Sequence, residues 1–196
     1  MNEQEKQLRD AIRTNDIKTV RYLIKEGVDV NRIDTSGHPL FMLAFRFKRI
    51  QITKLLIKAG ADVNIQNRDG LTLLMLAAFH GYKDIITLVL KAGADVNIRA
   101  EQAGITALGI AARRCGTDIV RLLLKNGADL NRADIHGTTP LVWASLRCDI
   151  DLVKLLLKHG ADPKLEDPKQ TTSLYYAIKF DQPEIVKLLI DAGAKR

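Results

Sequence analysis

The chain has 196 residues, of which 46 % are hydrophobic, and carries a formal net charge of +7. This hydrophobic content is enough to fill a buried core. The positive net charge is consistent with anionic partners and also with good solubility alone. No apolar run reaches the ~18 residues that a membrane-spanning helix needs, and the charged start MNEQEKQLRD lacks the apolar stretch of a secretory signal. We therefore expect no membrane segment and no signal peptide.

A short segment recurs along the whole chain. It reads EGVDVN at 26–31, AGADVN at 59–64 and again at 92–97, and NGADLN at 126–131, with shortened copies near residues 160 and 193. Its glycines are 33 residues apart, with one step of 34. A fixed period of this size indicates an array of stacked units. We therefore predict one domain, 1–196, of six repeats in which the first and last act as caps: 1–33, 34–66, 67–99, 100–133, 134–166 and 167–196.

The first repeat predicts two helices, over Gln4–Thr14 and Ile17–Glu26, each with apolar residues at helical spacing. The opposite side of the first helix is charged, as expected of a cap that faces water. Its charged residues are Glu3, Glu5, Lys6, Arg9 and Asp10.

Repeats two to five share one pattern. Each opens with a turn that ends in glycine, continues with a short helix that Thr72, Thr106 or Thr139 can cap, and ends with a longer apolar helix. Leu88 on such a longer helix is expected in the core. The recurring glycine after it predicts a left-handed helix end, and one extra residue near 100–104 should lengthen that turn.

The fifth repeat carries the clearest motifs. Asp134-x-x-Gly137-x-Thr139-Pro140-Leu141 is followed by Ala144, then by the helix DLVKLLL from Asp151, and the tail NGADLN closes the repeat before it. With these motifs the chain resembles ankyrin repeat proteins over its entire length. The resemblance implies an all-α solenoid of stacked helix-turn-helix units with projecting β-turn or hairpin loops.

The sequence departs from the family at the glycine between the two helices of a repeat. That glycine is present only as Gly81. A left-handed turn is tolerated by Asn or Asp, whereas Lys or Cys there should cost roughly 1–2 kcal/mol. The equivalent residues are Asn15, Lys48, Cys115, Cys148 and Asp181.

Residues for chemistry are sparse. The four histidines show no metal-ligand spacing, and Cys115 and Cys148 lack the adjacent base and cleft of a nucleophile. Equivalent positions in neighbouring repeats are ~8–10 Å apart, too far for a disulfide. We expect no enzyme, no cofactor and no metal, and free thiols in a reducing cytoplasm.

Binding is the expected function. In ankyrin repeat proteins, partners usually contact the turn tips and the exposed side of each first helix, which form a concave face. Mapped by register, this face should carry cations interleaved with three phenylalanines, a composition enriched in interface cores. The expected contact residues are Arg13, Arg46, Phe47, Arg68, Leu71, Phe79, His80, Ile105, Arg113, Arg114, Leu146, Arg147, Lys179 and Phe180.

The preferred interpretation is non-catalytic recognition of another protein, acidic and with an exposed apolar patch, by a chain that is monomeric by itself. The alternative is nucleic-acid or polyanion binding through these cations or through lysines on the outer helices, such as Lys54 and Lys154. A third is an inhibitor or immunity-type protein that occludes a partner enzyme. A ladder that includes Trp143 and Tyr176 is expected in the core rather than as a platform for bases.

Overall fold

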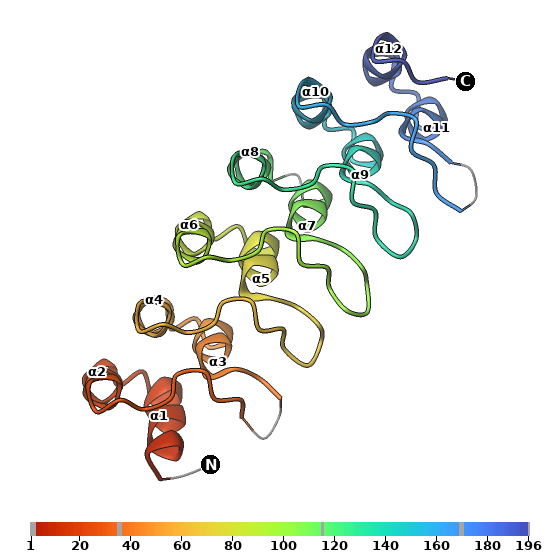
Figure 1. The fold of residues 1–196 in the computed structure, drawn as a ribbon. Coiled ribbons are helices and arrows are strands. Elements are labelled where there is room, and N and C mark those ends of the chain that lie inside the picture. The colour runs from red at the N-terminus through yellow and green to blue at the C-terminus, as the bar shows by residue number, and fades with distance from the viewer. Residues whose placement is uncertain (1–2, 35–36, 115, 169–170, 196) are drawn as a thin grey trace. The chain divides into compact units, whose positions relative to one another are not determined.

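The computed structural model describes residues 3–34, 37–114, 116–168 and 171–195, and its regular elements there are all helices. Six helix pairs follow one another along the chain, one pair for each predicted repeat (Figure 1). The fold is therefore an all-α repeat fold, as predicted. The helices are α1 (Glu3–Thr14), α2 (Ile17–Lys25), α3 (Leu40–Arg46), α4 (Ile50–Lys58), α5 (Leu73–His80), α6 (Lys83–Lys91), α7 (Ala107–Arg113), α8 (Thr117–Lys125), α9 (Pro140–Leu146), α10 (Ile150–Lys158), α11 (Ser173–Lys179) and α12 (Pro183–Asp191).

The chain forms two compact units. Met1–Leu74 and Asp84–Asp95 make the first, and Met75–Lys83 and Val96–Arg196 the second. In the first unit α1 packs beside α3 and α2 beside α4. In the second, α9 lies between α7 and α11, while α10 packs against both α9 and α12 (Figure 1). First helices of successive repeats are thus neighbours within each unit, and so are second helices.

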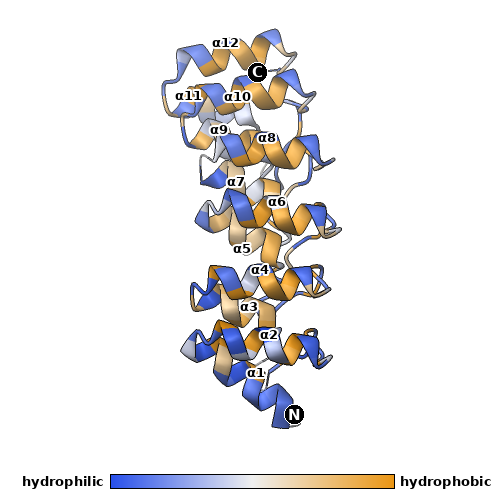
Figure 2. Ribbon diagram, turned by 90° about the vertical axis from the view of Figure 1, so that its left-hand side faces the viewer, coloured by the Kyte–Doolittle hydropathy of each residue, from blue (hydrophilic) through white to orange (hydrophobic). Residues whose placement is uncertain are grey.

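The second helices pack by one amphipathic stripe. α8 buries Ile119, Val120 and Leu123 while Arg121 faces solvent. In Figure 2 this appears as apolar and polar bands along the ribbons of α8, α10 and α12. The expectation of a buried Leu88 is wrong: it is half-buried, because α6 turns Ile85, Ile86 and Val89 inward and position 88 falls at the edge of that stripe.

Two of the three predicted threonine caps, Thr106 and Thr139, are present. The hydroxyls of Thr106 and Thr139 accept hydrogen bonds from the backbone N–H of Gly109 and Val142, at 3.2 and 3.3 Å. Thr72 is buried directly before α5. On a second helix, the Asp16 carboxylate accepts hydrogen bonds from the side chain and backbone of Thr19, which lowers the pKa of Asp16. These bonds satisfy donors that a helix N-terminus leaves free.

The recurring glycine that follows each second helix is left-handed in all six repeats. Its φ lies between +80 and +96° at Gly27, Gly60, Gly93, Gly127, Gly160 and Gly193. This confirms the predicted helix ends. The preference for glycine follows because a Cβ is disfavoured at such angles.

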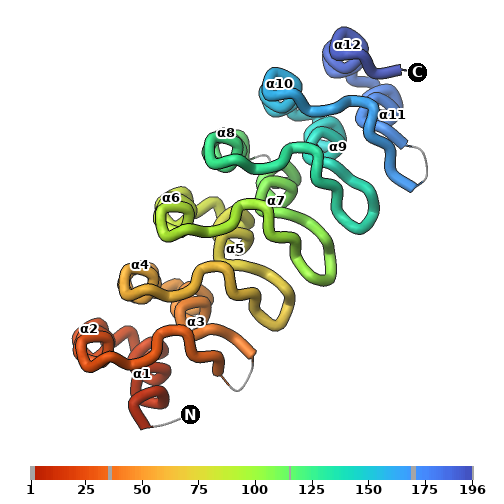
Figure 3. Tube along the Cα trace, in the orientation of Figure 1, coloured from red at the N-terminus to blue at the C-terminus, as the bar shows by residue number. Residues whose placement is uncertain are grey.

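The loops between repeats are hairpin-like and project beside the first helices within each unit (Figure 3). In the fifth repeat the backbone N–H of Asp134 donates to the carbonyl of Thr138, four residues on. In the fourth, the N–H of Ala100 donates to the carbonyl of Ile105, five residues on. The extra residue near 100–104 therefore lengthens this turn by one, as predicted.

A ladder of asparagines joins the tails of successive repeats. Asn97 Oδ1 accepts from the N–H of Asp129 at 2.8 Å, and Asn97 Nδ2 donates to the carbonyl of Gly127 at 3.0 Å. The same Asn-to-Asp bond recurs at the three other junctions among the first five repeats. Its further members are Asn31–Asp62, Asn64–Asp95 and Asn131–Asp162.

The first repeat corrects one expectation. Glu5 was expected to face water, but its side chain is 7 % exposed and Oε1 lies 2.9 Å from Arg32 Nε. The loop after α2 covers this carboxylate and supplies its counterion. A buried carboxylate needs such a partner.

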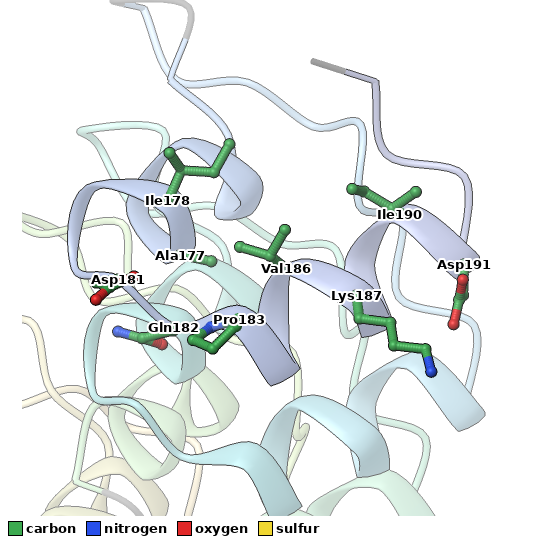
Figure 4. A pocket seen from close by; sticks show the side chains of 9 residues that line it. All are labelled: Ala177, Ile178, Asp181, Gln182, Pro183, Val186, Lys187, Ile190 and Asp191. Carbon is green, nitrogen blue, oxygen red and sulfur yellow. The ribbon is translucent and has the colours of Figure 1, made fainter.

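The sixth repeat exposes apolar side chains. Figure 4 shows Ile178, Val186 and Ile190 on one side of the α11–α12 pair, where they line a shallow hollow with Ala177 and Pro183. Ile178 is 51 % and Ile190 41 % exposed. The role of this repeat as a cap stays a prediction. Within the described part of the chain, no helix has the length and apolar character required to span a membrane.

Candidate functional site: cation–aromatic pairs at the ends of the first helices

The predicted contact residues divide between the two units. The second unit holds those at the C-terminal ends of α5, α7, α9 and α11, and they form what we call the cation–aromatic row. Its predicted members are Phe79, His80, Arg113, Arg114, Leu146, Arg147, Lys179 and Phe180. The first unit holds Arg13, Arg46, Phe47, Arg68 and Leu71.

Arg114 and Phe79 form the closest pair of the row. The guanidinium carbon of Arg114, at the end of α7, lies 4.7 Å from the ring centre of Phe79 at the end of α5. Phe79 is 47 % exposed, and its ring meets His80 edge-on at 5.2 Å. A cation over an aromatic face is attracted by roughly 0.5–1 kcal/mol at an exposed site. The contact fixes a charged and an apolar group side by side on the surface.

The next pair joins α7 to α9. Arg113 Cζ lies 5.1 Å from the ring centre of Trp143, which is half-buried, and the indole Nε1 is buried with no hydrogen-bond partner among the described residues. Trp143 was expected in the core, but it is only half-buried and its ring lies beside Arg113 of the row. Arg147, one residue beyond α9, is exposed.

An aromatic cluster ends the row on α11. The rings of Tyr176 and Phe180 stack at 6.5 Å with an interplanar angle of 11°, and Tyr175 meets Tyr176 edge-on at 5.3 Å. Lys179 Nζ lies 5.7 Å from the ring centre of Tyr175 and 6.0 Å from that of Phe180. Tyr175 is 46 % exposed and was not predicted. The residues at the equivalent positions of the earlier repeats, such as Met75 and Val142, are buried. Register therefore predicts a buried side chain at position 175.

Cations at these helix ends also have a local cause. Arg13, Arg46, Arg113 and Lys179 occupy the last turns of their helices. A positive charge there interacts favourably with the partial negative charge of the helix C-terminus. Helix stabilisation alone explains the arginines and lysine, but it does not explain exposed aromatic rings beside them.

One predicted contact residue is misplaced. Ile105 was expected at an exposed turn tip, but it is 8 % exposed. Its side chain fills the space above Gly109, where a Cβ would lie 2.8 Å from Ile105 Cγ1. Ile105 is therefore buried where Gly109, having no side chain, leaves room for it. Phe47, Leu71 and Leu146 are half-buried, and the other predicted contact residues are exposed.

Two lysines of the outer helices are paired with carboxylates of the following repeat. Lys54 Nζ lies 3.6 Å from Asp84 Oδ2 in the first unit, and Lys154 Nζ lies 2.7 Å from Glu184 Oε1 in the second. The hydrogen bond to Glu184 raises the pKa of Lys154. These pairs join neighbouring repeats, which weakens the interpretation of these lysines as free phosphate contacts.

The described residues contain no group of three His, Cys, Asp or Glu side chains that could hold a metal ion. Cys148 is an exposed free thiol, and Gln182 Nε2 lies 2.7 Å from its sulfur. Cys115 lies outside the described residues.

The sequence and the fold both match known proteins. The family model for ankyrin repeats (3 copies) matches residues 8–100 and 108–195. The chain belongs to the ankyrin repeat family. Ankyrin repeats form a non-enzymatic scaffold that binds other proteins. No curated protein sequence matches the chain.

Two solved ankyrin repeat structures are similar over nearly the whole chain. One is an ankyrin repeat domain, ABAYE2397, from Acinetobacter baumannii AYE, with 33 % identity, a TM-score of 0.91, and 97 % of this chain and 100 % of that chain covered. The other is the ankyrin repeat domain of Bcl-3, a member of the IkappaB protein family, with 26 % identity, a TM-score of 0.84, and 96 % and 86 % covered.

Proposed function

We propose that this ankyrin repeat chain is a non-catalytic binding module whose protein partner docks on the cation–aromatic row of the second unit. The observation that carries the proposal is the Arg114–Phe79 pair, in which a half-exposed ring lies 4.7 Å from a guanidinium carbon. Aromatic and arginine side chains are the types enriched among the residues that dominate binding energies. Arg113 beside Trp143 and Lys179 beside Phe180 repeat the combination on adjacent first helices.

The chemistry of the row defines the partner. The predicted members from Phe79 to Phe180 include four cations and no carboxylate, so the partner should be acidic. Guanidinium groups can bind its carboxylates bidentately, and Phe79 and Phe180 offer apolar contacts to an exposed hydrophobic patch. Charge should then govern the association rate and its salt dependence, while the rings slow dissociation. The free chain is proposed to be monomeric.

The test is affinity capture with wild type and with Phe79→Ala/Arg114→Glu as baits, each with and without nuclease. The expected result is a protein that survives nuclease and is lost, at least tenfold, with the variant. Arg21→Glu/Tyr22→Ala is a matched control, because it removes an exposed arginine and an exposed ring from α2. Equal loss with both variants contradicts the proposed row.

Two further readouts separate the alternatives. Material that disappears with nuclease from every bait indicates nucleic-acid binding instead. If the captured protein is an enzyme whose activity falls at one-to-one stoichiometry, the module is an inhibitor.

Trp143 is the single tryptophan of the chain and lies beside Arg113, so docking of a partner on the row should change the fluorescence of Trp143.

A further inference from the structure

A hollow of about 400 Å³ in the first unit is lined by three arginines. Arg9 and Arg13 come from α1, and Arg46 from the end of α3. Phe47 forms part of the wall, with Arg13 Cζ 6.0 Å from its ring centre. The hollow belongs to the first unit alone, so it is separate from the cation–aromatic row.

Two nitrogen atoms of residues that line the hollow are buried and make no hydrogen bond within the described residues. Within the described ranges, neither Arg9 Nε nor His38 Nδ1 has a hydrogen-bond partner. Arg9 Nε lies 3.5 Å from Asp10 Oδ1, and His38 Nδ1 lies 3.8 Å from Asp34 Oδ1, beyond the usual range of such bonds. Buried polar atoms without a hydrogen-bond partner are rare in native proteins, and those that occur usually bind water or an ion. An acceptor oxygen of a ligand would satisfy Arg9 Nε, and also His38 Nδ1 in the tautomer that carries its proton on that nitrogen.

The charge around the hollow is positive. The lining contains three arginines and one carboxylate, that of Asp34, whose Oδ1 already accepts the backbone N–H of His38 at 2.9 Å. The carboxylate of Asp10 lies beside Arg9, outside the lining. With the imidazole counted as neutral, the lining carries a formal charge of +2, or +1 together with Asp10, so the hollow favours an anion. Guanidinium groups match the geometry of phosphate oxygens and can bind them bidentately.

We propose that this hollow binds the dianionic phosphoryl group of a phosphomonoester. Its volume exceeds that of a phosphate alone and leaves room for the group that carries it, against the apolar wall of Leu43 and Phe47. The carrier is either a small phosphomonoester or a phosphorylated side chain of another protein. Both present the same phosphoryl oxygens to Arg9, Arg13 and Arg46.

The test is calorimetric titration of the whole chain with O-phosphoserine and with inorganic phosphate at constant ionic strength. We expect saturable one-to-one binding that Arg13→Gln/Arg46→Gln weakens at least tenfold. Arg21→Gln/Arg121→Gln is the matched control, because it removes the same charge from exposed arginines of α2 and α8 and should bind as wild type. Equal weakening in both variants, or no saturable binding by wild type, overturns the proposal.

Two further arms define the site and the source. Malonate, a dianion with a different arrangement of oxygens, should bind at least tenfold more weakly, and equal affinity overturns the phosphoryl assignment. The ¹⁵N resonances of the His38 ring should shift on titration with O-phosphoserine, and their constancy at saturation also overturns it. A phosphoserine peptide that binds more tightly than the free amino acid identifies a protein carrier, and equal affinity identifies a small phosphomonoester.

Discussion

At the scale of single residues, the turn between the two helices of a repeat imposes its backbone angles on whatever residue occupies it. Lys48 has a φ of 57° and Cys148 a φ of 55°, close to the 77° of Gly81. The hydrogen bonds around Lys48 and Gly81 are equivalent: Lys48 N–H donates to Phe45 and Gly81 N–H to Ala78, three residues back in each case. Packing of the helix pair therefore holds non-glycine residues in a conformation that they otherwise disfavour.

Substitution of Lys48 by glycine should stabilise the protein. Removal of the left-handed strain should outweigh the added flexibility of the unfolded chain, for a net gain of about 0.5–1 kcal/mol in the free energy of unfolding. Chemical denaturation of wild type and Lys48→Gly measures this gain. Gly81→Ala is the reverse control and should lose a similar amount, since a Cβ there meets no atom within 4 Å. A less stable Lys48→Gly would show that the lysine side chain contributes packing instead.

At the scale of elements, the asparagine ladder joins repeats that otherwise meet through apolar helix faces. Apolar packing is non-directional, whereas the two hydrogen bonds of Asn97 to Asp129 and Gly127 fix one register between adjacent tails. The sequence displays the ladder as a recurring Asp-x-Asn, but periodicity does not reveal what the amide contacts. In the fifth repeat Lys164 stands at the asparagine position. Its ammonium group has no acceptor atom, so its side chain cannot accept a hydrogen bond from the backbone of the sixth repeat.

Loss of the Asn97 amide should destabilise the second unit. Asn97→Ala removes an acceptor and a donor between repeats, and we expect the free energy of unfolding to fall by about 1–2 kcal/mol. Asn97→Asp keeps the acceptor for the Asp129 N–H and should lose less. Denaturant unfolding, followed by circular dichroism, measures both. Equal losses for the two variants would show that the donated bond to Gly127, not the accepted one, carries the effect.

At the scale of the whole molecule, the repeat period in the sequence predicted the backbone features that every repeat shares. It did not predict the positions of side chains that differ from their equivalents in other repeats. The helix pairs, the threonine caps, the left-handed ends and the lengthened turn all follow from register. Ile105 was misplaced because its side chain fills the space beside Gly109, a residue that has larger equivalents in the other repeats. Tyr175 was missed because its equivalents are buried. The pairing of Arg114 with Phe79 depends on side-chain rotamers, which periodicity does not define.

The apolar hollow on α11 and α12 follows from the same periodicity. Ile178 is equivalent to Ala112 and Ser145, which are both fully buried, yet it is 51 % exposed. Val186, equivalent to the buried Val153, is half-buried (Figure 4). Within the second unit these positions of earlier repeats are covered, so the sixth repeat presents to solvent a surface of the type that repeats use to pack on one another.

Polar substitution of this surface should leave the fold intact and increase solubility. In Ile178→Glu/Ile190→Lys both changed side chains are already half exposed, so we expect unchanged helical circular dichroism, weaker binding of an apolar dye, and less precipitation by ammonium sulfate. Tyr22→Lys is the matched control: Tyr22 is 58 % exposed on α2, outside the α11–α12 hollow, and its loss should change dye binding much less. A drop in helical signal for the double variant alone would mean that Ile178 and Ile190 hold α11 and α12 together. In that case Ile178 and Ile190 would serve to stabilise the contact between α11 and α12, and their exposure would not indicate a surface that packs against another repeat.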